Sequence, residues 1–200
     1  VLYQAEGGGV TPILPISDIA LPGMHNVENY MAAFAAVRGL VSAETMDAVA
    51  RNFHGVEHRI ERIRVRRGVR WYNDSIASSP SRTIAGLRSF PEKVILIAGG
   101  KDKGISYDAI GPEINEHVKY LILCGATAGV IRESVLKAAN YAGLPIREVQ
   151  DYHEAVALAD EVSGEGDVVI LSPASTSFDR FANFMERGRV FKDIVNALPD

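Results

Sequence analysis

Three short segments of the chain combine hydroxyl groups, glycines and lysines in a way that suits the binding of a small anion. They read NDSIASSP from Asn73, GGKDKG from Gly99 and SPASTS from Ser172. Glycines let the backbone approach a ligand closely, lysines add positive charge, and hydroxyl groups near the start of a helix donate hydrogen bonds to carboxylates or phosphates. Each segment alone is more simply a solvated turn or a helix cap. The three together favour a binding site for an anionic substrate.

Parallel strands would bring these three segments to the same place. From Glu61 onward, apolar strand-like runs alternate with segments of helical pattern. The runs that we expect to form strands read RIRVRR, VRWYND, KVILIAGG, VKYLILCG, IREV and DVVILSPA. This alternation predicts an α/β fold with a Rossmann-like, mostly parallel sheet and helices on both faces. Ligands of such sheets bind beyond the carboxyl ends of the strands, and each of the three segments directly follows a predicted strand.

Helix start signals support this alternation. Pro80 follows Ser79, as a first-turn proline follows its N-cap, and Asp151 with Glu154 has the spacing of a capping box. We expect further helices at the end of the chain, over residues 178–198.

The first part of the chain has a different organisation. Residues 1–22 mix short β-like runs with GGG and prolines, and two helices are expected at residues 26–40 and 42–53. The segment FHGVEHR then interrupts the helical pattern. We therefore expect one domain over residues 1–56 and a second over residues 57–200. Because the chain begins without Met, in a strand-like run, we expect it to be part of a longer protein.

The composition is that of a globular protein without a nucleic-acid footprint. The chain has 200 residues, 47% of them hydrophobic, and a formal net charge of −4, and its basic residues form no long run. Arg64, Arg66 and Arg70 alternate with apolar residues, so we expect them on the solvated side of a strand. The single cysteine, Cys124, lies in an apolar run and is expected to be a buried thiol in a reducing compartment. No apolar stretch approaches the ~20 residues that span a bilayer, so we expect a cytoplasmic protein with no membrane insertion and no nucleic-acid partner.

Several familiar signatures are absent from the sequence. GGKDKG differs from the phosphate-binding pattern GxxxxGK[ST], and no GxGxxG opens a strand-helix unit. The five histidines lack metal-ligand spacing, and no GxSxG nucleophile motif occurs. We therefore predict no metal site and no catalytic residue in this chain, but a site that binds and positions an anionic substrate.

The same segments, in this order and at these intervals, resemble the C-terminal domain of the bacterial Mur ligases. The third segment continues as LSPASTSFDRFANFMERGRVF, which within the family resembles the members that add D-glutamate. Upstream, LPGMHNVENYMAAFAA and FHGVEHRIE resemble the end of the central ATPase domain of the family and its junction with the last domain. The resemblance covers nearly the whole chain from Leu21.

This resemblance implies ATP-dependent amide formation. ATP phosphorylates the carboxylate of the acceptor, UDP-N-acetylmuramoyl-L-alanine, and the amino group of D-glutamate attacks the resulting acyl phosphate. Residues 1–56 would be a remnant of the central ATP-binding domain, and residues 57–200 the D-glutamate-binding domain. ATP and Mg²⁺ are the cofactors that the resemblance implies for the full-length enzyme, which we expect to be a monomer.

The resemblance also assigns roles to individual positions. Lys103 matches a lysine that pairs with a D-glutamate carboxylate. The other positions expected to contact D-glutamate are Ser78, Ser177, Phe178 and Phe184. The positions expected to contact ATP are Asn26 and Asn29 at the adenine, and Arg59 and Asp74 at the ribose and phosphates, with His58 beside them. Two of these assignments have structural alternatives, because the phenylalanines also suit a helical core stripe and Asn26 suits a helix N-cap.

The sequence departs from the family pattern in places that matter for binding. Ile76 stands where many members carry a lysine, and SPASTS replaces the commoner SPACAS while keeping Ser177. The sequence contains no P-loop, no UDP-binding domain and none of the Mg²⁺-holding residues of the central domain, so we expect the chain alone to be inactive. Two alternatives stay open, namely a sister ligase of the folylpolyglutamate type and a stand-alone Rossmann-like module that binds an anionic metabolite.

Overall fold

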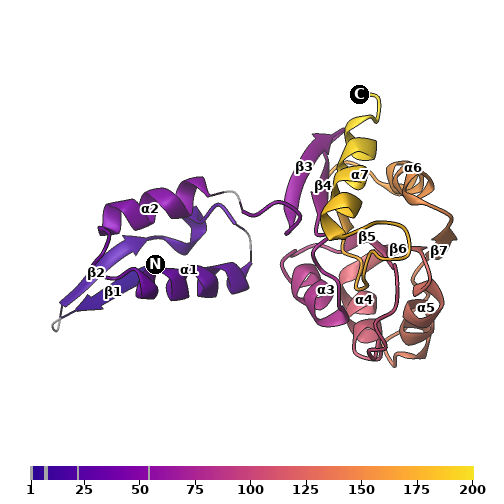
Figure 1. Ribbon diagram of the computed structural model, residues 1–200, viewed down its shortest axis with the longest axis horizontal. Helices are drawn as coiled ribbons and strands as arrows, with labels where there is room; N and C mark the ends of the chain where they lie inside the picture. Colours follow the sequence, from indigo (N-terminus) through magenta and orange to yellow (C-terminus); the bar gives the residue numbers. More distant parts are fainter. Residues whose placement is uncertain (1, 7–8, 22, 54) are drawn as a thin grey trace. The chain divides into compact units, whose positions relative to one another are not determined.

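The computed structural model describes residues 2–6, 9–21, 23–53 and 55–200. It separates into two compact units, Val1–Gly55 and Val56–Asp200 (Figure 1). His54, within the FHGVEHR segment, lies outside the described residues.

The first unit consists of a small antiparallel hairpin and two helices. Strands β1 (Leu2–Glu6) and β2 (Gly9–Leu14) pair with each other, and a short 3-10 helix follows at Ile16–Asp18. Helices α1 (Met24–Ala36) and α2 (Ala43–Asn52) complete the unit. Its apolar core cluster contains the buried residues Leu2, Leu14, Val27, Tyr30 and Ala50, and Met46 is also buried.

The two predicted helices of this unit are present, but both boundaries of α1 differ, since it begins at Met24 rather than at residue 26. Helix α2 begins as predicted, because the Ser42 side chain accepts a hydrogen bond from the Thr45 amide at 3.3 Å. Helix α1 ends at Ala36 rather than near residue 40, and Gly39 in the following turn has a φ of 77°. A left-handed glycine just beyond a helix is a common stop signal.

The second unit is built on a six-stranded sheet with the strand order β3-β4-β8-β5-β6-β7. Strand β3 pairs antiparallel with β4, and the pairs β4/β8, β8/β5, β5/β6 and β6/β7 are parallel. The strands are β3 (Glu61–Arg66), β4 (Val69–Asn73), β5 (Val94–Ala98), β6 (Val118–Cys124), β7 (Ile146–Val149) and β8 (Val168–Leu171). The helices are α3 (Pro80–Leu87), α4 (Ile110–His117), α5 (Ala128–Lys137), α6 (Tyr152–Val162) and α7 (Phe184–Asn196).

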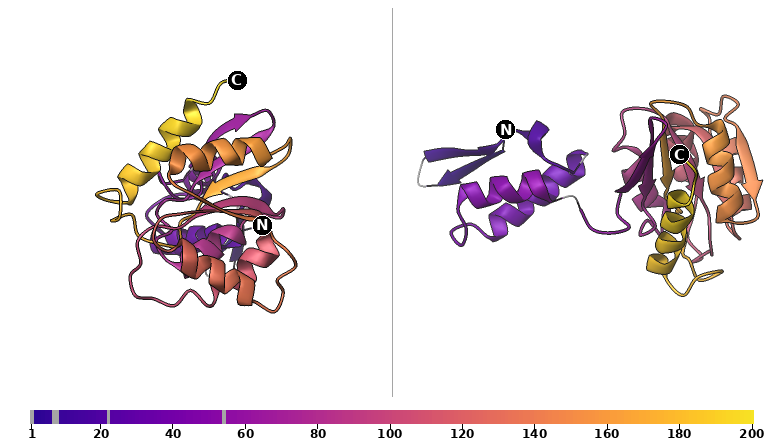
Figure 2. Two further views of the ribbon diagram at one scale, coloured as in Figure 1. Left: turned by 90° about the vertical axis from the view of Figure 1, so that its right-hand side faces the viewer. Right: turned by 90° about the horizontal axis from the view of Figure 1, so that it is seen from above.

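Helices cover both faces of this sheet, as predicted. Helices α3, α4 and α5 contribute to one apolar core, and α6 and α7 contribute to the core on the opposite face (Figure 2). Every residue of β5 is buried, because a strand in the centre of such a sheet is covered on both sides. The fold class predicted from the alternation of strands and helices is therefore confirmed.

The helix start signals are also confirmed. Helix α3 begins at Pro80 directly after Ser79, and the Asp151 side chain accepts a hydrogen bond from the Glu154 amide at 2.9 Å. Among the residues described, no helix combines the length and the apolar character that a membrane span needs.

Two local expectations are wrong. The predicted terminal helices reduce to α7, which begins at Phe184, because Asn183 caps it there and accepts a hydrogen bond from the Glu186 amide at 2.9 Å. Arg66 is not solvated but 4% exposed, since its guanidinium donates to Asp160 and to the Pro199 carbonyl. Arg64 and Arg66 therefore mark a strand face that the C-terminal residues cover, whereas Arg70 contacts Glu92 and the Gly166 carbonyl.

Candidate anion-binding site at the carboxyl ends of the strands

Three loops meet at one edge of the sheet in the second unit, as the sequence predicted. They are the 73–79 loop after β4, the 99–107 loop after β5 and the 172–177 loop after β8. Strands β4, β8 and β5 are direct neighbours and run parallel, so the three loops leave the sheet side by side. Backbone hydrogen bonds connect the 99–107 and 172–177 loops: the Gly99 amide donates to the Pro173 carbonyl at 2.8 Å, and Lys101 and Thr176 exchange a pair of bonds at 2.9 and 3.1 Å.

The polar residues assigned to D-glutamate lie on these loops. The Lys103 ammonium donates to the Ser78 hydroxyl at 3.3 Å, which joins the 99–107 loop to the 73–79 loop. Ser177 follows Thr176, whose backbone pairs with Lys101, and is itself 2% exposed. The structure thus brings one cation and hydroxyl groups from separate loops to a common rim, while their role as ligands stays a prediction.

The two phenylalanines assigned to the same ligand differ in their surroundings. The Phe178 side chain is 62% exposed and lies outside any helix, so a helical core stripe that includes Phe178 is wrong. The Phe184 ring packs against His58 with ring centroids 6.0 Å apart, and its backbone carbonyl accepts a bond from the Ser75 hydroxyl at 2.8 Å. Phe181 stacks on Tyr152 at a centroid distance of 5.7 Å, in the core under α6.

His58 lies inside the second unit rather than on its surface. The Asn73 side-chain amide donates to His58 Nδ1 at 2.8 Å and to the Glu61 carboxylate at 3.0 Å. Burial lowers the pKa of the His58 imidazole, and the neighbouring carboxylates of Glu57 and Glu61 oppose this shift. The adjacent Arg59 is exposed, and its predicted contact with ATP stays a prediction.

Asp74 is the most perturbed acid of the site. Its carboxylate is buried and accepts bonds from the Ser172 hydroxyl at 2.7 Å and the Ile60 amide at 3.3 Å. Burial raises the pKa of Asp74 to about 7, against the opposing effect of these hydrogen bonds and of Arg59. In this arrangement Asp74 fixes the start of β3 to the end of β8, and its predicted contact with ATP stays a prediction.

The two residues assigned to adenine lie in the first unit, in the early turns of α1. The Asn29 side-chain amide donates to the Asn26 side-chain oxygen at 3.4 Å. Gly23 occupies the N-cap position of α1, so Asn26 is not the helix cap that it also suited. The role of both asparagines in nucleotide binding stays a prediction.

Arg187, on α7, is a site residue that the sequence-based reasoning missed. Its guanidinium is 1% exposed and donates to the Ser75 hydroxyl at 3.0 Å, the Ser75 carbonyl at 2.8 Å and the Ser175 carbonyl at 3.1 Å. No acidic side chain forms an ion pair with it among the residues that the structure describes, and burial lowers its pKa. A signal was available, because Arg187 shares the helical register of the buried Phe191 and Val195.

One cluster in this unit has the composition of a metal site. Ligand atoms of Glu57, His58 and Glu61 lie within 4.8 Å of one another. The Lys192 ammonium already contacts both carboxylates, at 3.1 and 2.5 Å. The single positive charge of Lys192 therefore offsets one of the two negative charges of this cluster.

Two solved structures illustrate the similarity of this fold to known proteins. The bifunctional folylpolyglutamate synthase/dihydrofolate synthase from Yersinia pestis superposes with a TM-score of 0.66 at 16% identity, covering 96% of this chain and 43% of that one. UDP-N-acetylmuramate-alanine ligase from Thermotoga maritima superposes with a TM-score of 0.65 at 16% identity, covering 88% of this chain and 39% of that one. At such identities the similarity shows the fold alone.

Sequence comparison places the chain more narrowly. Residues 58–175 match the family model described as "Mur ligase, glutamate ligase domain", so the chain belongs to the Mur ligase family. It is 54% identical to UDP-N-acetylmuramoylalanine--D-glutamate ligase of Acetivibrio thermocellus, over 99% of this chain and 43% of that protein. The protein of the same name from Symbiobacterium thermophilum is 53% identical, over 96% and 42%. The chain thus spans less than half the length of these relatives.

Proposed function

We propose that this chain is the amino-acid-binding part of an ATP-dependent ligase that joins D-glutamate to UDP-N-acetylmuramoyl-L-alanine. Relatives with more than half of their aligned residues identical carry the name of this activity. The observation that carries the proposal is the rim at the carboxyl ends of β4, β5 and β8, where Lys103 reaches Ser78 beside the 172–177 loop. We propose a cytoplasmic role in the synthesis of a peptidoglycan precursor.

In the proposed reaction, ATP transfers its terminal phosphoryl group to the acceptor carboxylate and leaves as ADP. The amino group of D-glutamate then attacks the acyl carbon, the carbon-nitrogen bond forms, and inorganic phosphate leaves as the amine gives up a proton. The contribution of this chain is to hold D-glutamate in the orientation for attack, which accounts for a large part of the rate in such reactions.

The residues of the rim match the charge of D-glutamate. Lys103 would pair with one carboxylate, and the hydroxyl groups of Ser78 and Ser177 would donate to carboxylate oxygens. The Arg187 charge lies behind the Ser75 and Ser175 backbone, where it makes the site more favourable for an anion. Ile76 contributes no charge here, so the site depends on Lys103 more strongly than it would in a family member with a lysine at this position.

ATP and Mg²⁺ fit this chain only in part. The exposed Arg59 suits a phosphate group, and the amides of Asn26 and Asn29 suit a purine ring. The acidic pair Glu57 and Glu61 is already bound to the Lys192 ammonium, which offsets one of the two negative charges and competes with a Mg²⁺ ion for both carboxylates. We therefore propose that Mg²⁺ binds in the remainder of the full-length enzyme.

Replacement of Lys103 by alanine in the full-length enzyme tests the proposal. We expect the KM for D-glutamate to rise about thirtyfold, because the loss of a charged contact costs about 2 kcal/mol. The KM for ATP should stay within about twofold, and Lys137→Ala, an exposed lysine paired with Glu133, is the matched control. Equal increases for both substrates, or a wild-type enzyme that incorporates another amino acid in preference to D-glutamate, would contradict the proposal.

A further inference from the structure

The segment that carries Lys103 is an arch, residues 102–106, whose side chains are exposed. Its first end is fixed by the backbone pair between Lys101 and Thr176. The Thr176 hydroxyl adds a bond to the Lys101 carbonyl at 2.9 Å. The first end of the arch is therefore attached to the 172–177 loop, next to Ser177.

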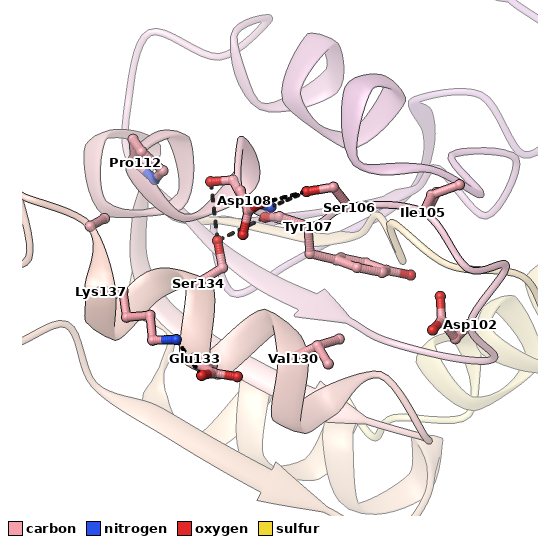
Figure 3. Close-up of a pocket in the computed structure, with 11 residues that line it drawn as sticks. Asp102, Ile105, Ser106, Tyr107, Asp108, Pro112, Val130, Glu133, Ser134 and Lys137 are labelled. Carbon is pink, nitrogen blue, oxygen red and sulfur yellow. Dashed lines mark hydrogen bonds and ion pairs between the residues drawn. The ribbon is translucent and has the colours of Figure 1, made fainter.

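Tyr107 fixes the second end of the arch. Its hydroxyl group lies 2.9 Å from the Ser175 hydroxyl, and both are buried. Its carbonyl accepts a bond from the Ser134 hydroxyl of α5 at 2.7 Å (Figure 3). The far end of the arch thus returns to the same 172–177 loop from which it started.

Ser175 connects the two ends. Its hydroxyl also lies 2.7 Å from the Thr127 hydroxyl, which accepts a bond from the Gly100 amide at 3.0 Å. Each buried hydroxyl has an acceptor if Tyr107 donates to Ser175, Ser175 donates to Thr127, and Thr127 donates to the Gly100 carbonyl at 3.2 Å. Such a buried and connected chain of hydrogen bonds fixes the backbone on either side of it.

The arch has little support from behind. A cavity of about 560 Å³ lies between it and α5, lined by Asp102, Ile105 and Tyr107 on one side and by Val130 and Glu133 on the other (Figure 3). Because a cavity lies behind residues 102–106, the position of Lys103 depends on the two ends of the arch, on its contact with Ser78 and on the bond from the Gly104 amide to the Asp102 carboxylate at 2.9 Å.

We propose that Tyr107 and Ser175 are positioning residues for the amino-acid substrate, through the hydrogen bond between their hydroxyl groups. This bond sets the span of the arch and hence the reach of the Lys103 ammonium toward Ser78 and a bound carboxylate. Neither residue contacts the substrate in this scheme. The proposal has a structural part, that this bond orders the arch, and a kinetic part, that it favours the binding of D-glutamate. Only the kinetic part rests on the proposed D-glutamate ligase function.

The structural part is tested by replacing Tyr107 with phenylalanine in this chain, which removes the hydroxyl and keeps the ring. Backbone ¹⁵N relaxation reports motion of each amide on the picosecond-to-nanosecond timescale. We expect the order parameters of residues 102–106 to fall while those of β5 and β8 stay unchanged. Tyr141→Phe, at an exposed tyrosine beyond α5, is the matched control and should change neither region. Unchanged order parameters in the arch of Tyr107→Phe would overturn the proposal.

The kinetic part uses the same substitutions in the full-length enzyme. We expect the KM for D-glutamate to rise about fivefold, the equivalent of about 1 kcal/mol for one neutral hydrogen bond, with kcat and the KM for ATP unchanged. A parallel increase in both KM values would indicate general damage and would overturn the positioning role. If Tyr107→Phe does not fold, Thr176→Val removes the hydroxyl bond to Lys101 at the other end and should give the same selective rise. A wild-type enzyme that does not use D-glutamate would refute the proposed function, and the order parameters would then decide the structural part alone.

Discussion

Replacement of Gly188 by alanine is the sharpest test of the packing around the site. Gly188 is buried on α7, and a Cβ atom built there would lie 2.2 Å from His58 Nδ1, 2.8 Å from His58 Cε1 and 3.1 Å from the Asn73 side-chain nitrogen. The histidine ring cannot retreat freely, because Asn73 holds its Nδ1 atom and the Phe184 ring packs against it. The added methyl group must therefore displace His58 or shift α7.

The expected cost combines three effects. Overpacking of a well-packed site costs about 1–3 kcal/mol, and the loss of the bond between Asn73 and His58 adds about 1 kcal/mol. The higher helix propensity of alanine offsets this by stabilising the helix by about 1 kcal/mol. We therefore expect Gly188→Ala to lower the free energy of unfolding by about 2 kcal/mol.

Urea unfolding followed by tryptophan fluorescence measures this change in the second unit. The chain has a single tryptophan, Trp71, which is fully buried in β4. Gly129→Ala is the matched control, because Gly129 lies on α5 and a Cβ atom there meets nothing within 4 Å. We expect this control to be neutral or to stabilise by up to about 1 kcal/mol. If Gly188→Ala proves as stable as Gly129→Ala, the described packing of His58 against α7 is incorrect.

Three further predictions follow from buried groups and from the incomplete site. The pKa of Asp74 is about 7 in the folded protein against 3.8 as its ordinary value, so its stabilising effect is present below about pH 4 and lost as the pH rises through 7. We compare the free energies of unfolding in urea of wild type and Asp74→Asn at pH 4 and at pH 8. The stability of the variant relative to wild type should rise by up to about 4 kcal/mol from pH 4 to pH 8, because only the wild type loses the effect of the Asp74 proton. A difference that stays constant with pH would contradict the assigned pKa. Arg187→Met leaves the Ser75 and Ser175 carbonyls without a donor and should destabilise the second unit by about 3 kcal/mol in the same assay, whereas the exposed Arg189→Met should change it by less than about 0.5 kcal/mol. The 200-residue chain should bind D-glutamate only weakly in calorimetry, because sites of this kind are completed by domain closure, and submillimolar binding would count against this.

The sheet and its binding edge were predictable because their signals are local. The run VILIA of β5 is continuously apolar, which is typical of a strand covered on both faces. Ser42, Ser79 and Asp151 begin helices where the sequence places them, since an N-cap acts within one turn. The carboxyl ends of parallel strands share an edge, so the rim followed from the order of strands and helices alone.

The order of the strands and the buried charges were not predictable in the same way. Strand β8 lies between β4 and β5, although it follows them by some seventy residues or more, and only the assembled sheet shows that the three loops are direct neighbours. Arg66 and Arg187 have partners that are distant in sequence, namely Asp160 and the Pro199 carbonyl for Arg66 and the Ser75 and Ser175 carbonyls for Arg187. The helical register of Arg187 indicates that it is buried, but a single sequence does not identify the groups that it contacts.

The 73–79 loop connects His58, which is assigned to the ATP side, with Ser78, which is assigned to D-glutamate. The orientation of the Asn73 amide is determined by its partners, because the Ser75 amide must donate to its oxygen and the Glu61 carboxylate must accept from its nitrogen. The same nitrogen faces His58 Nδ1, so that atom must be the acceptor, and the ring is neutral with its proton on Nε2, in agreement with its lowered pKa. Two residues further on, Ser75 is held by Arg187. These bonds therefore connect His58, on the side assigned to ATP, with Asn73 and Ser75 at the base of the loop that presents Ser78 to Lys103.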